Sequence, residues 1–525
     1  MKRYLPVILA LPMALSSCDK GLERDPYGST DFEYGKDLSH EMIVLGDRLE
    51  NPYKTVNMQA ALASVYPTKG RVPVETTDLY VRFLPLSRAD EDMLTSLGVD
   101  LVDHPLDYAI QKEGDYYVDP ALGDGRITWQ YAVVPKDFVF PDITYEVIDE
   151  CFLSENSAST RAGDGIDWDE VEREAYRLTG NESRLAPSTK AAKSKPQGRI
   201  TLVDPDADGG KPVGVAGITV AVNSFVKIGK AVCDRDGYYT IDKEFSSDVR
   251  YRLVFQNEKD FAIGFNMILV PASVSTLGKS GPEGVNLTVT RDSEDKLWRR
   301  CVVNNAAYNY MERCSKEDLD INTPPGGLRF WIFGGLNKSA ALMAHHGTLV
   351  SNTALGKLLG EYSPLLTYFT PDIMIGAKDL NTCRELYSNT CHEMAHASHY
   401  ARVGNEWWHD YIMYIVESFI KDWELSYGDG QSDNAGLCEL GEMWAYYLQA
   451  KMEKERYGGE LQTYGTSWWF FPQVFHYLEE RGFTASEIIA GLDPDVRSRA
   501  SLITKLAELY PARRTTIDQA FNRYK

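Results

Sequence analysis

The stretch C-H-E-M-A-H at residues 391–396 is where the spacing of reactive side chains in this 525-residue chain dictates a chemistry. Side chains four positions apart lie on the same face of a helix, so His392 and His396 can direct two imidazoles at one metal ion. Glu393 follows the first histidine and can reach a water molecule at that metal. The pattern therefore predicts a metal-binding helix with a catalytic base.

The residues around this stretch favour a helix of defined length. Thr382 and Glu385 have the spacing of an N-terminal capping box. Arg402 falls in the expected last turn, where a cation interacts favourably with the helix dipole, and Gly404 is a suitable C-terminal stop.

Two histidines leave a tetrahedral zinc ion short of one protein ligand. The pattern H-E-x-x-H-x-x-G-x-x-H would supply a third histidine, but this chain has His399 and Arg402 at the two decisive positions. We therefore expect a glutamate from a second helix. A helical pattern begins at Asp433 or Asn434 and stops at Gly458-Gly459, and its residues Glu439 and Glu442 share one face.

The segment E-M-W-A-Y-Y at residues 442–447 resembles the E-x-x-A-x-[YF] helix of the gluzincin metallopeptidases, a zincin group. The resemblance covers about 45 motif-bearing residues in two helices. It implies a Zn²⁺ site of His392, His396 and Glu442, with Glu439 as an alternative ligand or as a residue behind the ligands. It gives no role to a further helical segment at about residues 406–420.

The first residues resemble a bacterial lipoprotein signal. Lys2 and Arg3 precede an apolar run, and L-S-S-C at residues 15–18 resembles a lipobox. The apolar run is too short to cross a bilayer. We expect residues 1–17 to be removed, Cys18 to be acylated, and residues 18–30 to form a polar tether. The expected location is the envelope of a Gram-negative bacterium, as an outer-membrane lipoprotein facing the periplasm or the surface, with the lipid as the membrane contact.

Composition narrows the remaining function classes. The net charge of −21 and the lack of a basic patch argue against a nucleic-acid partner. Seven cysteines follow Cys18 without C-x-x-C spacing, which favours neither a cysteine zinc site nor a disulfide framework. Because seven is odd, at least one thiol is expected to be free.

The segment 31–182 reads as an α+β domain without recognisable chemistry. Apolar spacing predicts helix over residues 31 to about 70, and strands are expected at 79–84 and 127–134. Residues 183–197 have the composition of a linker.

Short strand patterns separated by turns follow at residues 198–290 and predict a β-sandwich. The segments G-V-A-G-I-T-V (214–220) and C-D-R-D-G-Y-Y-T-I (233–241) resemble the carboxypeptidase regulatory-like, or transthyretin-like, domain. That resemblance implies a non-catalytic accessory, which we expect to fold independently and to be dispensable for metal binding.

The catalytic segment is expected at residues 296–525. Strands are predicted at 328–333 and 373–376, and residues 372–376 are placed to be the edge strand that pairs with an extended substrate peptide. The rest reads as largely helical. The predicted fold class is therefore multidomain α+β, with a mostly helical zincin-like lobe preceded by the sandwich and the N-terminal domain. Candidate oxyanion donors on later helices are His409, Tyr446, Tyr447 and His476.

Two functions fit these patterns. The first is a lipid-anchored zinc metallopeptidase that acts on a peptide or protein substrate, with Glu393 as general base. The second is a non-catalytic surface lipoprotein for binding or adhesion, whose zincin-like lobe has lost turnover. The intact Glu393 favours the enzyme, because a decayed site does not need that base.

Overall fold

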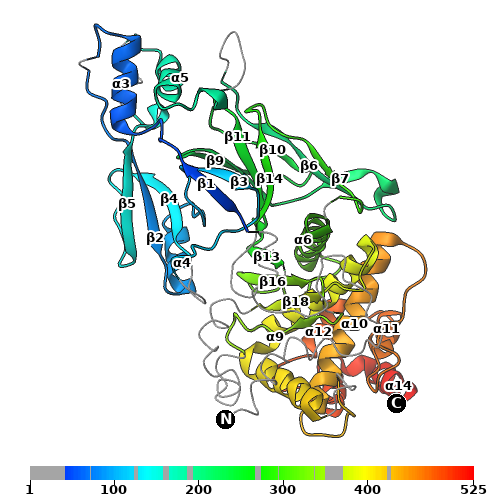
Figure 1. Ribbon diagram of the computed structural model, residues 1–525. Helices are drawn as coiled ribbons and strands as arrows, with labels where there is room; N and C mark the ends of the chain where they lie inside the picture. Colours follow the sequence, from blue (N-terminus) through cyan, green and yellow to red (C-terminus); the bar gives the residue numbers. More distant parts are fainter. Residues whose placement is uncertain are drawn as a thin grey trace.

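The computed structural model describes residues 42–525 except 71, 123–127, 158–164, 186–192, 266–273, 294, 336, 349–370 and 422–426. In this part of the chain the fold is mixed α+β with several structural units, as predicted, and contains ten α-helices and five β-sheets. Strand-rich units lie at one end and the C-terminal helices at the other (Figure 1). The predicted signal peptide, Cys18 and the tether lie outside the described residues.

The N-terminal unit combines a three-stranded antiparallel sheet of order β4-β2-β5, a two-stranded sheet β1-β3, and helices α3 and α5, which pack against each other. Its elements are β1 (Val44–Arg48), α3 (Thr55–Val65), β2 (Asp78–Leu84), α4 (Arg88–Ser96), β3 (Tyr108–Lys112), β4 (Gln130–Pro135), β5 (Thr144–Cys151) and α5 (Trp168–Leu178). The strands predicted at 79–84 and 127–134 correspond to β2 and β4.

The helix predicted over residues 31–70 is wrong for its middle part. Residues 31–41 lie outside the described chain, and residues 44–48 form β1, which pairs antiparallel with β3. The Ile43 backbone N–H donates to the carbonyl of Tyr116 at 2.8 Å. Only Thr55–Val65 is helical. The apolar residues near 42–49 face a strand far along the chain, and local periodicity does not reveal such a partner.

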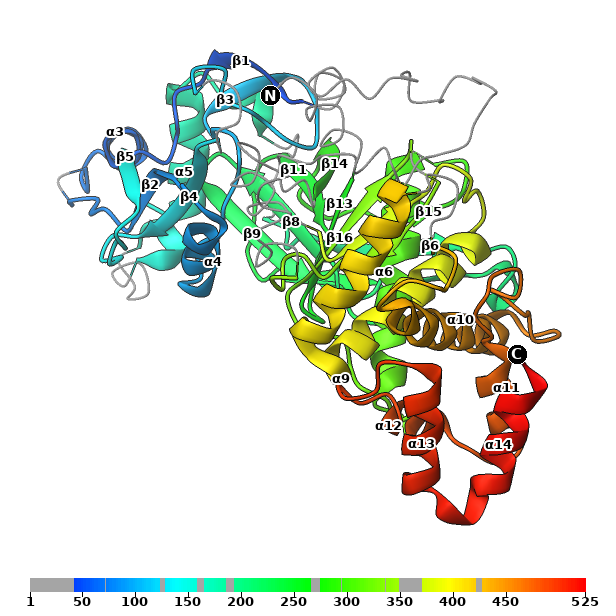
Figure 2. The same ribbon diagram turned by 90° about the horizontal axis from the view of Figure 1, so that it is seen from below.

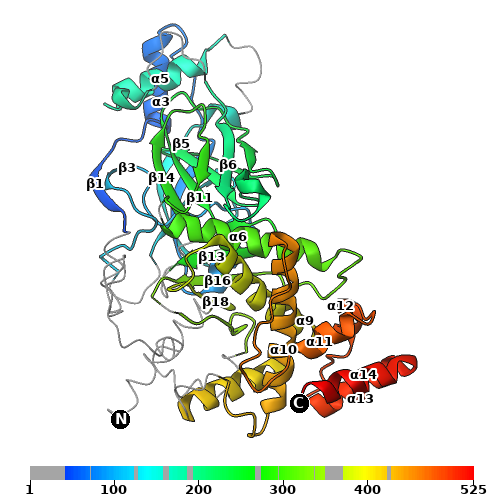
Figure 3. The same ribbon diagram turned by 90° about the vertical axis from the view of Figure 1, so that its right-hand side faces the viewer.

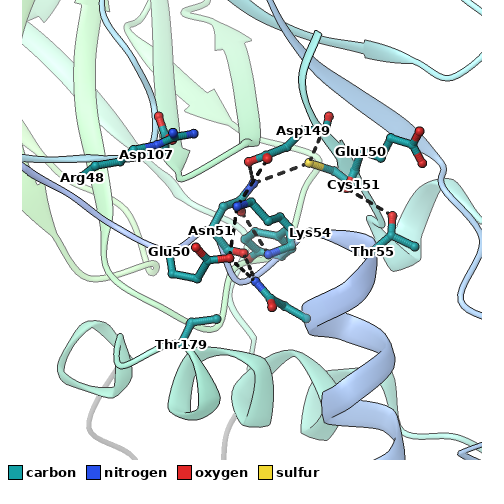
Figure 4. A network of polar contacts seen from close by, with 12 residues as sticks. Arg48, Glu50, Asn51, Lys54, Thr55, Asp107, Asp149, Glu150, Cys151 and Thr179 are labelled. Atoms are coloured by element: carbon teal, nitrogen blue, oxygen red, sulfur yellow. Dashed lines mark hydrogen bonds and ion pairs between the residues drawn. The ribbon is translucent and has the colours of Figure 1, made fainter.

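A buried polar contact fixes the start of α3 against β5 (Figure 4). The Asn51 side-chain amide lies 3.5 Å from both the Asp149 carboxylate and the Cys151 sulfur, and its oxygen accepts the Tyr53 N–H at 3.0 Å. Lys54 adds an ion pair with Asp149 at 3.4 Å. These bonds satisfy a fully buried amide and connect the turn before α3 to β5.

Two four-stranded sheets follow, of order β10-β6-β15 with β7 beside β6, and β14-β11-β8-β9. Their strands are β6 (Gln197–Val203), β7 (Pro212–Gly214), β8 (Thr219–Ser224), β9 (Lys227–Val232), β10 (Tyr238–Thr240), β11 (Val249–Val254), β14 (Val274–Ser280) and β15 (Leu287–Val289). Leu202, Val220 and Leu253 from both sheets share one buried core. One of the turns between these strands contains Gly237, which has φ +83° and where a Cβ would meet the Ile200 carbonyl.

The predicted linker is attached to this sandwich at both ends. Leu185 bridges to Ser247 and Ser194 bridges to Phe245, while residues 186–192 lie outside the described chain. Glu172 of α5 also joins the two units, because it pairs with Lys227 of β9 at 3.3 Å and accepts from Ser246 at 2.6 Å. Burial alone would raise the pKa of Glu172, but Lys227 and the other nearby lysine outweigh it and lower the pKa to about 2.

The sheet of the C-terminal segment has the order β12-β13-β16-β18-β17, with β13, β16 and β18 parallel and the two outer strands antiparallel. Its strands are β12 (Gln256–Asn257), β13 (Phe261–Phe265), β16 (Leu328–Phe333), β17 (Ala340–Ala341) and β18 (Ile373–Gly376). The strands predicted at 328–333 and 373–376 are confirmed. Among the described residues, however, β18 is internal and the short β17 is the edge, so the prediction of an edge strand at 372–376 is wrong.

The expectation that residues 198–290 form an independent sandwich does not match the pairing of the strands. β12 and β13 lie within that range but belong to the C-terminal sheet, where Ile263 pairs with Phe330. One buried apolar cluster runs from Ile200 of the sandwich to Phe521 near the C-terminus. The sandwich and the C-terminal segment therefore share a core, and the boundary near residue 290 cuts through it.

Helix α6 (Asp295–Cys314) lies between the sandwich and the C-terminal sheet (Figure 3). It is buried along most of its length, and its arginines bond to both sides. Arg300 donates to the Ser275 hydroxyl of β14 at 2.8 Å. Arg299 donates to the carbonyls of Ala377 and Leu380, after β18, at 2.7 Å each. A chain lacking either neighbour would lose these bonds and leave Arg299 with its ion pair to Asp295 and Arg300 with its ion pair to Asp115.

The remaining chain is largely helical, as predicted (Figure 2). Its helices are α9 (Cys383–Lys421), α10 (Ala435–Tyr457), α11 (Gln473–Glu479), α12 (Ala485–Ala490), α13 (Arg499–Leu509) and α14 (Arg514–Arg523). The seven cysteines after Cys18 are all buried, and none of them forms a disulfide in the described part of the chain. In the described part of the chain, no helix has the length and apolar character needed to span a membrane.

The shared core gives a prediction about truncated chains. We expect a chain of residues 195–525, which keeps the sandwich, to unfold cooperatively in urea. A chain of residues 296–525 should not, because it lacks β13 and leaves one face of α6 and one side of β16 exposed. Urea unfolding followed by tryptophan fluorescence tests this. Cooperative unfolding of the shorter chain would contradict the shared core.

Candidate metal centre

The predicted metal-binding helix begins at the expected cap. The Glu385 N–H donates to the Thr382 hydroxyl at 3.2 Å, and the Thr382 N–H donates to the Glu385 carboxylate at 3.0 Å. This reciprocal pair is a capping box. The helix is interrupted at Gly404, where φ is +80° and ψ is 178°. The predicted start and stop are therefore confirmed, and a second helical stretch continues from there to Lys421.

His392, His396 and Glu442 come together where α9 packs against α10. The Nε2 atom of His392 lies 3.5 Å from Glu442 Oε2, and the Nε2 atom of His396 lies 3.5 Å from Glu442 Oε1. All three side chains are buried, and one ligand atom from each lies within 4.8 Å of the others. The three residues that the resemblance named thus form one compact group.

The spacing of these atoms fits a shared metal ion better than direct hydrogen bonds. A distance of 3.5 Å exceeds the 2.7–3.2 Å of a normal N–H···O bond. Ligands at about 2.0–2.1 Å from a tetrahedral zinc ion lie roughly 3.3–3.4 Å from one another. Two imidazoles and one carboxylate are also a donor set that zinc accepts. The group could therefore bind a metal ion.

Buried oxygens without partners support the same interpretation. Glu442 Oε2 and Glu393 Oε2 are buried and have no hydrogen-bond partner among the described residues. The other oxygen of Glu442 accepts the Tyr411 hydroxyl at 2.6 Å. Tyr411 thus fixes Oε1, which also faces His396, while Oε2 faces His392 without a donor. A buried carboxylate oxygen without a donor is costly unless a cation compensates it.

The pKa values of the three residues are shifted in different directions by their surroundings. Burial alone would raise the pKa of Glu442, but the two imidazoles outweigh it and hold that pKa well below its usual range. Burial would also lower the pKa of His392, but the neighbouring carboxylates raise it. For His396, burial prevails and the pKa is lowered. A carboxylate held ionised beside two imidazoles, at least one of them neutral, is the protonation state that metal ligands require.

Glu393 lies beside the ligands and next to the edge strand β17. It is 3% exposed, and it accepts a backbone hydrogen bond from Ala341. Burial raises its pKa to about 8, against the attraction of His392 and with a further increase from the negative charge of Glu442. A carboxyl group with a raised pKa beside a metal-binding group is suited to proton transfer.

Glu439 lies outside this group. Its carboxylate pairs with Arg499 of α13 at 2.9 Å, one helical turn from Glu442. His399, which extends the same face of α9, packs against the Trp407 ring with centroids 4.6 Å apart. Burial lowers its pKa to about 3. Glu442, and not Glu439, is the carboxylate that faces both histidines.

The suggested oxyanion donors lie at different places. Tyr446 contacts the metal-binding group edge-on, with its ring centroid 4.4 Å from that of His392. His409 is directed at the carbonyl of Thr348, 2.6 Å from its Nδ1. Tyr447 and His476 contact each other. Of the four candidates, Tyr446 is the one whose ring contacts a histidine of the metal-binding group.

Two residues that form hydrogen bonds with the group were not predicted from the sequence. Tyr411 lies in the helical stretch that had no role in the resemblance, and it donates to Glu442. Gln449 forms a hydrogen bond of 3.1 Å with His392 Nδ1. The available signal for Gln449 was its position seven residues after Glu442, because that spacing returns to the same face of a helix.

Comparisons with known proteins add no family. No family model matches the chain, and no curated protein matches it. Among solved structures, a crystal structure of (S)-allantoin synthase is similar over 23% of this chain and 48% of that chain. The identity is 12% and the TM-score is 0.12. The match spans about half of that protein, and a TM-score this low supports no conclusion about fold or function.

The contact of Tyr411 with Glu442 gives a prediction about metal affinity. Tyr411→Phe removes the donor from a buried carboxylate oxygen, so Zn²⁺ affinity should fall by about 10–100-fold. Chelator competition measures this. Tyr414→Phe is the matched control, because Tyr414 is a buried tyrosine of the same helix whose hydroxyl bonds to the carbonyl of Tyr427. Equal affinities of the two variants would show that Tyr411 does not support the ligand.

The raised pKa of Glu393 predicts how stability depends on pH in the metal-free protein. Its pKa is about 8 in the folded protein, against 4.5 for an ordinary glutamate in an unfolded chain. The neutral form therefore favours folding, and its contribution is complete below about pH 4.5 and is lost as the pH rises through about 8. Its size is on the order of a few kcal/mol. Glu393→Gln lacks this contribution, so the difference in urea midpoint between variant and wild type should change across that window. Parallel pH profiles would contradict the prediction.

Proposed function

We propose that this chain is a zinc-dependent metallopeptidase. The observation that carries the proposal is the buried group of His392, His396 and Glu442 with Glu393 beside it and the strand edge of β17 next to Glu393. Each part has a separate role in peptide hydrolysis. All of them lie where α9, α10 and the sheet that contains β17 meet.

His392, His396 and Glu442 would hold the metal, as the distances between their ligand atoms allow. A zinc ion bound there would supply a Lewis acid and lower the pKa of a water molecule toward neutrality. Glu393 accepts a proton from the attacking water and passes it to the leaving amine. Its burial excludes competing solvent, so the proton stays between Glu393 and the substrate.

Substrate alignment follows from the sheet. In the described part of the chain β17 pairs with β18 on one side only. We infer that an extended peptide binds along the other side of β17. The Ala341 N–H bonds to Glu393 and the Ala341 carbonyl accepts from Trp408 Nε1 at 3.1 Å, so a peptide that pairs with Ala341 would replace these bonds. Ala341 of β17 donates to Glu393, so a peptide bound along β17 passes the general base. The function is thus hydrolysis of a peptide bond in an extended segment.

We also interpret the C-terminal segment as a zincin-like lobe and the preceding strands as a transthyretin-like sandwich, on the motifs that carry those resemblances. Anchoring by a lipid at Cys18 in the bacterial envelope is part of the same proposal. It depends only on the lipobox and is independent of the metal-binding group.

Three substitutions test the function. Glu393→Gln keeps the ligands and removes the base, so zinc should remain while peptide hydrolysis falls by about 10²–10⁴-fold or more. Glu442→Ala should abolish high-affinity zinc binding, because it removes a ligand. Glu439→Ala is the matched control, since it deletes the same side chain one turn away, where the partner is Arg499.

Zinc content by elemental analysis and hydrolysis of a denatured protein substrate are the two measurements. Zinc in the wild type without hydrolysis would favour the non-catalytic binding lipoprotein. Loss of zinc in Glu439→Ala but not in Glu442→Ala would contradict the ligand assignment.

A further inference from the structure

A buried polar chain leads away from the metal-binding group between α9 and α10. His392 Nδ1 lies 3.1 Å from the amide oxygen of Gln449. The amide nitrogen of Gln449 donates to the Ser388 hydroxyl at 3.0 Å, and Ser388 donates to Glu453 at 2.6 Å. All four residues are at most 8% exposed. None of these contacts is explained by metal ligation alone.

This series of hydrogen bonds forms because the two helices run antiparallel and the bonded residues are four positions apart on each helix. Ser388 and His392 are four residues apart on α9, and Gln449 and Glu453 are four residues apart on α10. Each pair lies on one face of its helix, so the two faces meet in successive contacts. As the residue number rises along α9, the partner's number falls along α10, from Glu453 to Gln449 to Glu442.

The far end of the chain is a carboxylate that can only accept. Glu453 is 2% exposed and accepts two bonds from Arg384, each of 2.8 Å. Its other oxygen accepts from Ser388 and from the hydroxyl of Tyr464. Because a guanidinium donates to one oxygen and two hydroxyl groups lie at the other, the carboxylate acts as the acceptor in all of these contacts. Ser388 must therefore give its single proton to Glu453.

This requirement fixes every bond that follows. Since the Ser388 proton is used, its oxygen must accept from the NH₂ group of Gln449. The carbonyl oxygen of Gln449 then faces His392, so Nδ1 of His392 must carry a proton. The reverse amide orientation would place the Gln449 oxygen against a hydroxyl oxygen that has no proton left. The neutral imidazole of His392 thus keeps its free lone pair on Nε2, the atom that faces Glu442.

We infer that Gln449 is a positioning residue that sets the tautomer of His392 through Ser388 and Glu453, and so prepares Nε2 to bind a metal. The inference rests on the proposed metal site. It applies to one of the two histidines, because Nδ1 of His396 has no hydrogen-bond partner among the described residues. The two ligand histidines are therefore held by different means.

Metal affinity is the first test. Gln449→Met keeps the length of the side chain but provides no acceptor, so Zn²⁺ affinity should fall by about 10–100-fold. Ser388→Ala should lower it less, and Ser388→Thr should restore it because the hydroxyl returns. Ser398→Ala is the matched control. It removes a buried hydroxyl from the same helix. Ser398 lies 3.0 Å from the Tyr310 hydroxyl and takes no part in the hydrogen bonds that lead to His392.

The tautomer itself is the second test, and it needs no metal. In metal-free protein with ¹⁵N-labelled histidine, at alkaline pH where the imidazole is neutral, the His392 signals should be those of an Nδ1–H tautomer. His392→Gln identifies its signals among the nine histidines. Glu453→Gln is nearly isosteric but can donate to Ser388, which permits the reverse orientation of Gln449. The His392 signals should then shift toward a mixture of both tautomers.

The outcomes separate this inference from the proposed function. If the wild type binds no zinc but His392 is the Nδ1–H tautomer and Glu453→Gln changes it, the metal site fails and the positioning role stands. If Gln449→Met binds zinc as tightly as the wild type, or if Glu453→Gln leaves the His392 signals unchanged, the inference is overturned. Urea unfolding of each variant shows whether a lost affinity arises from unfolding instead, and in that case the tautomer measurement decides.

Discussion

The contact between α9 and α10 has to hold two imidazoles and two carboxylates out of water. His392, His396, Glu393 and Glu442 are each at most 6% exposed. An isolated charge loses several kcal/mol of solvation at such a position, so each group must find a compensating charge, a hydrogen bond or a metal ion. The protein supplies part of this compensation through Tyr411. The two carboxylate oxygens without donors are the part that a cation would complete.

The position of α10 depends on elements outside the C-terminal segment. At its end, Arg456 and Tyr457 both bond to Asp204, at 3.1 Å and 2.8 Å, and Asp204 belongs to the loop after β6 of the sandwich. Asp204 is 2% exposed, so this contact is buried. Together with the pairing of β13 with β16, it makes the sandwich a structural part of the site's surroundings. The strands between residues 198 and 290 therefore contribute to the core that supports the metal-binding group.

The sequence could predict those features whose signal is local. The capping box at Thr382, the break at Gly404 and the strands at 328–333 and 373–376 follow from short-range spacing. It could not predict β17, because two alanines carry no strand pattern, nor the transfer of β13 to another sheet, because that pairing joins distant segments. Tyr411 and Gln449 were missed for a different reason. A polar residue on a buried face is recognised only when its partner on another helix is known.

The long separation between the second histidine and Glu442 has a structural explanation. The chain breaks at Gly404 and forms the helical stretch to Lys421 before it returns as α10. That stretch provides Trp408, whose ring lies 5.7 Å from that of His396, and Tyr411, which bonds to Glu442. It therefore contacts one ligand on each helix, His396 and Glu442. Tyr411 donates to Oε1 of Glu442, whereas Oε2 faces His392 and has no hydrogen-bond partner among the described residues, so Oε2 is the oxygen whose burial a bound metal ion would compensate.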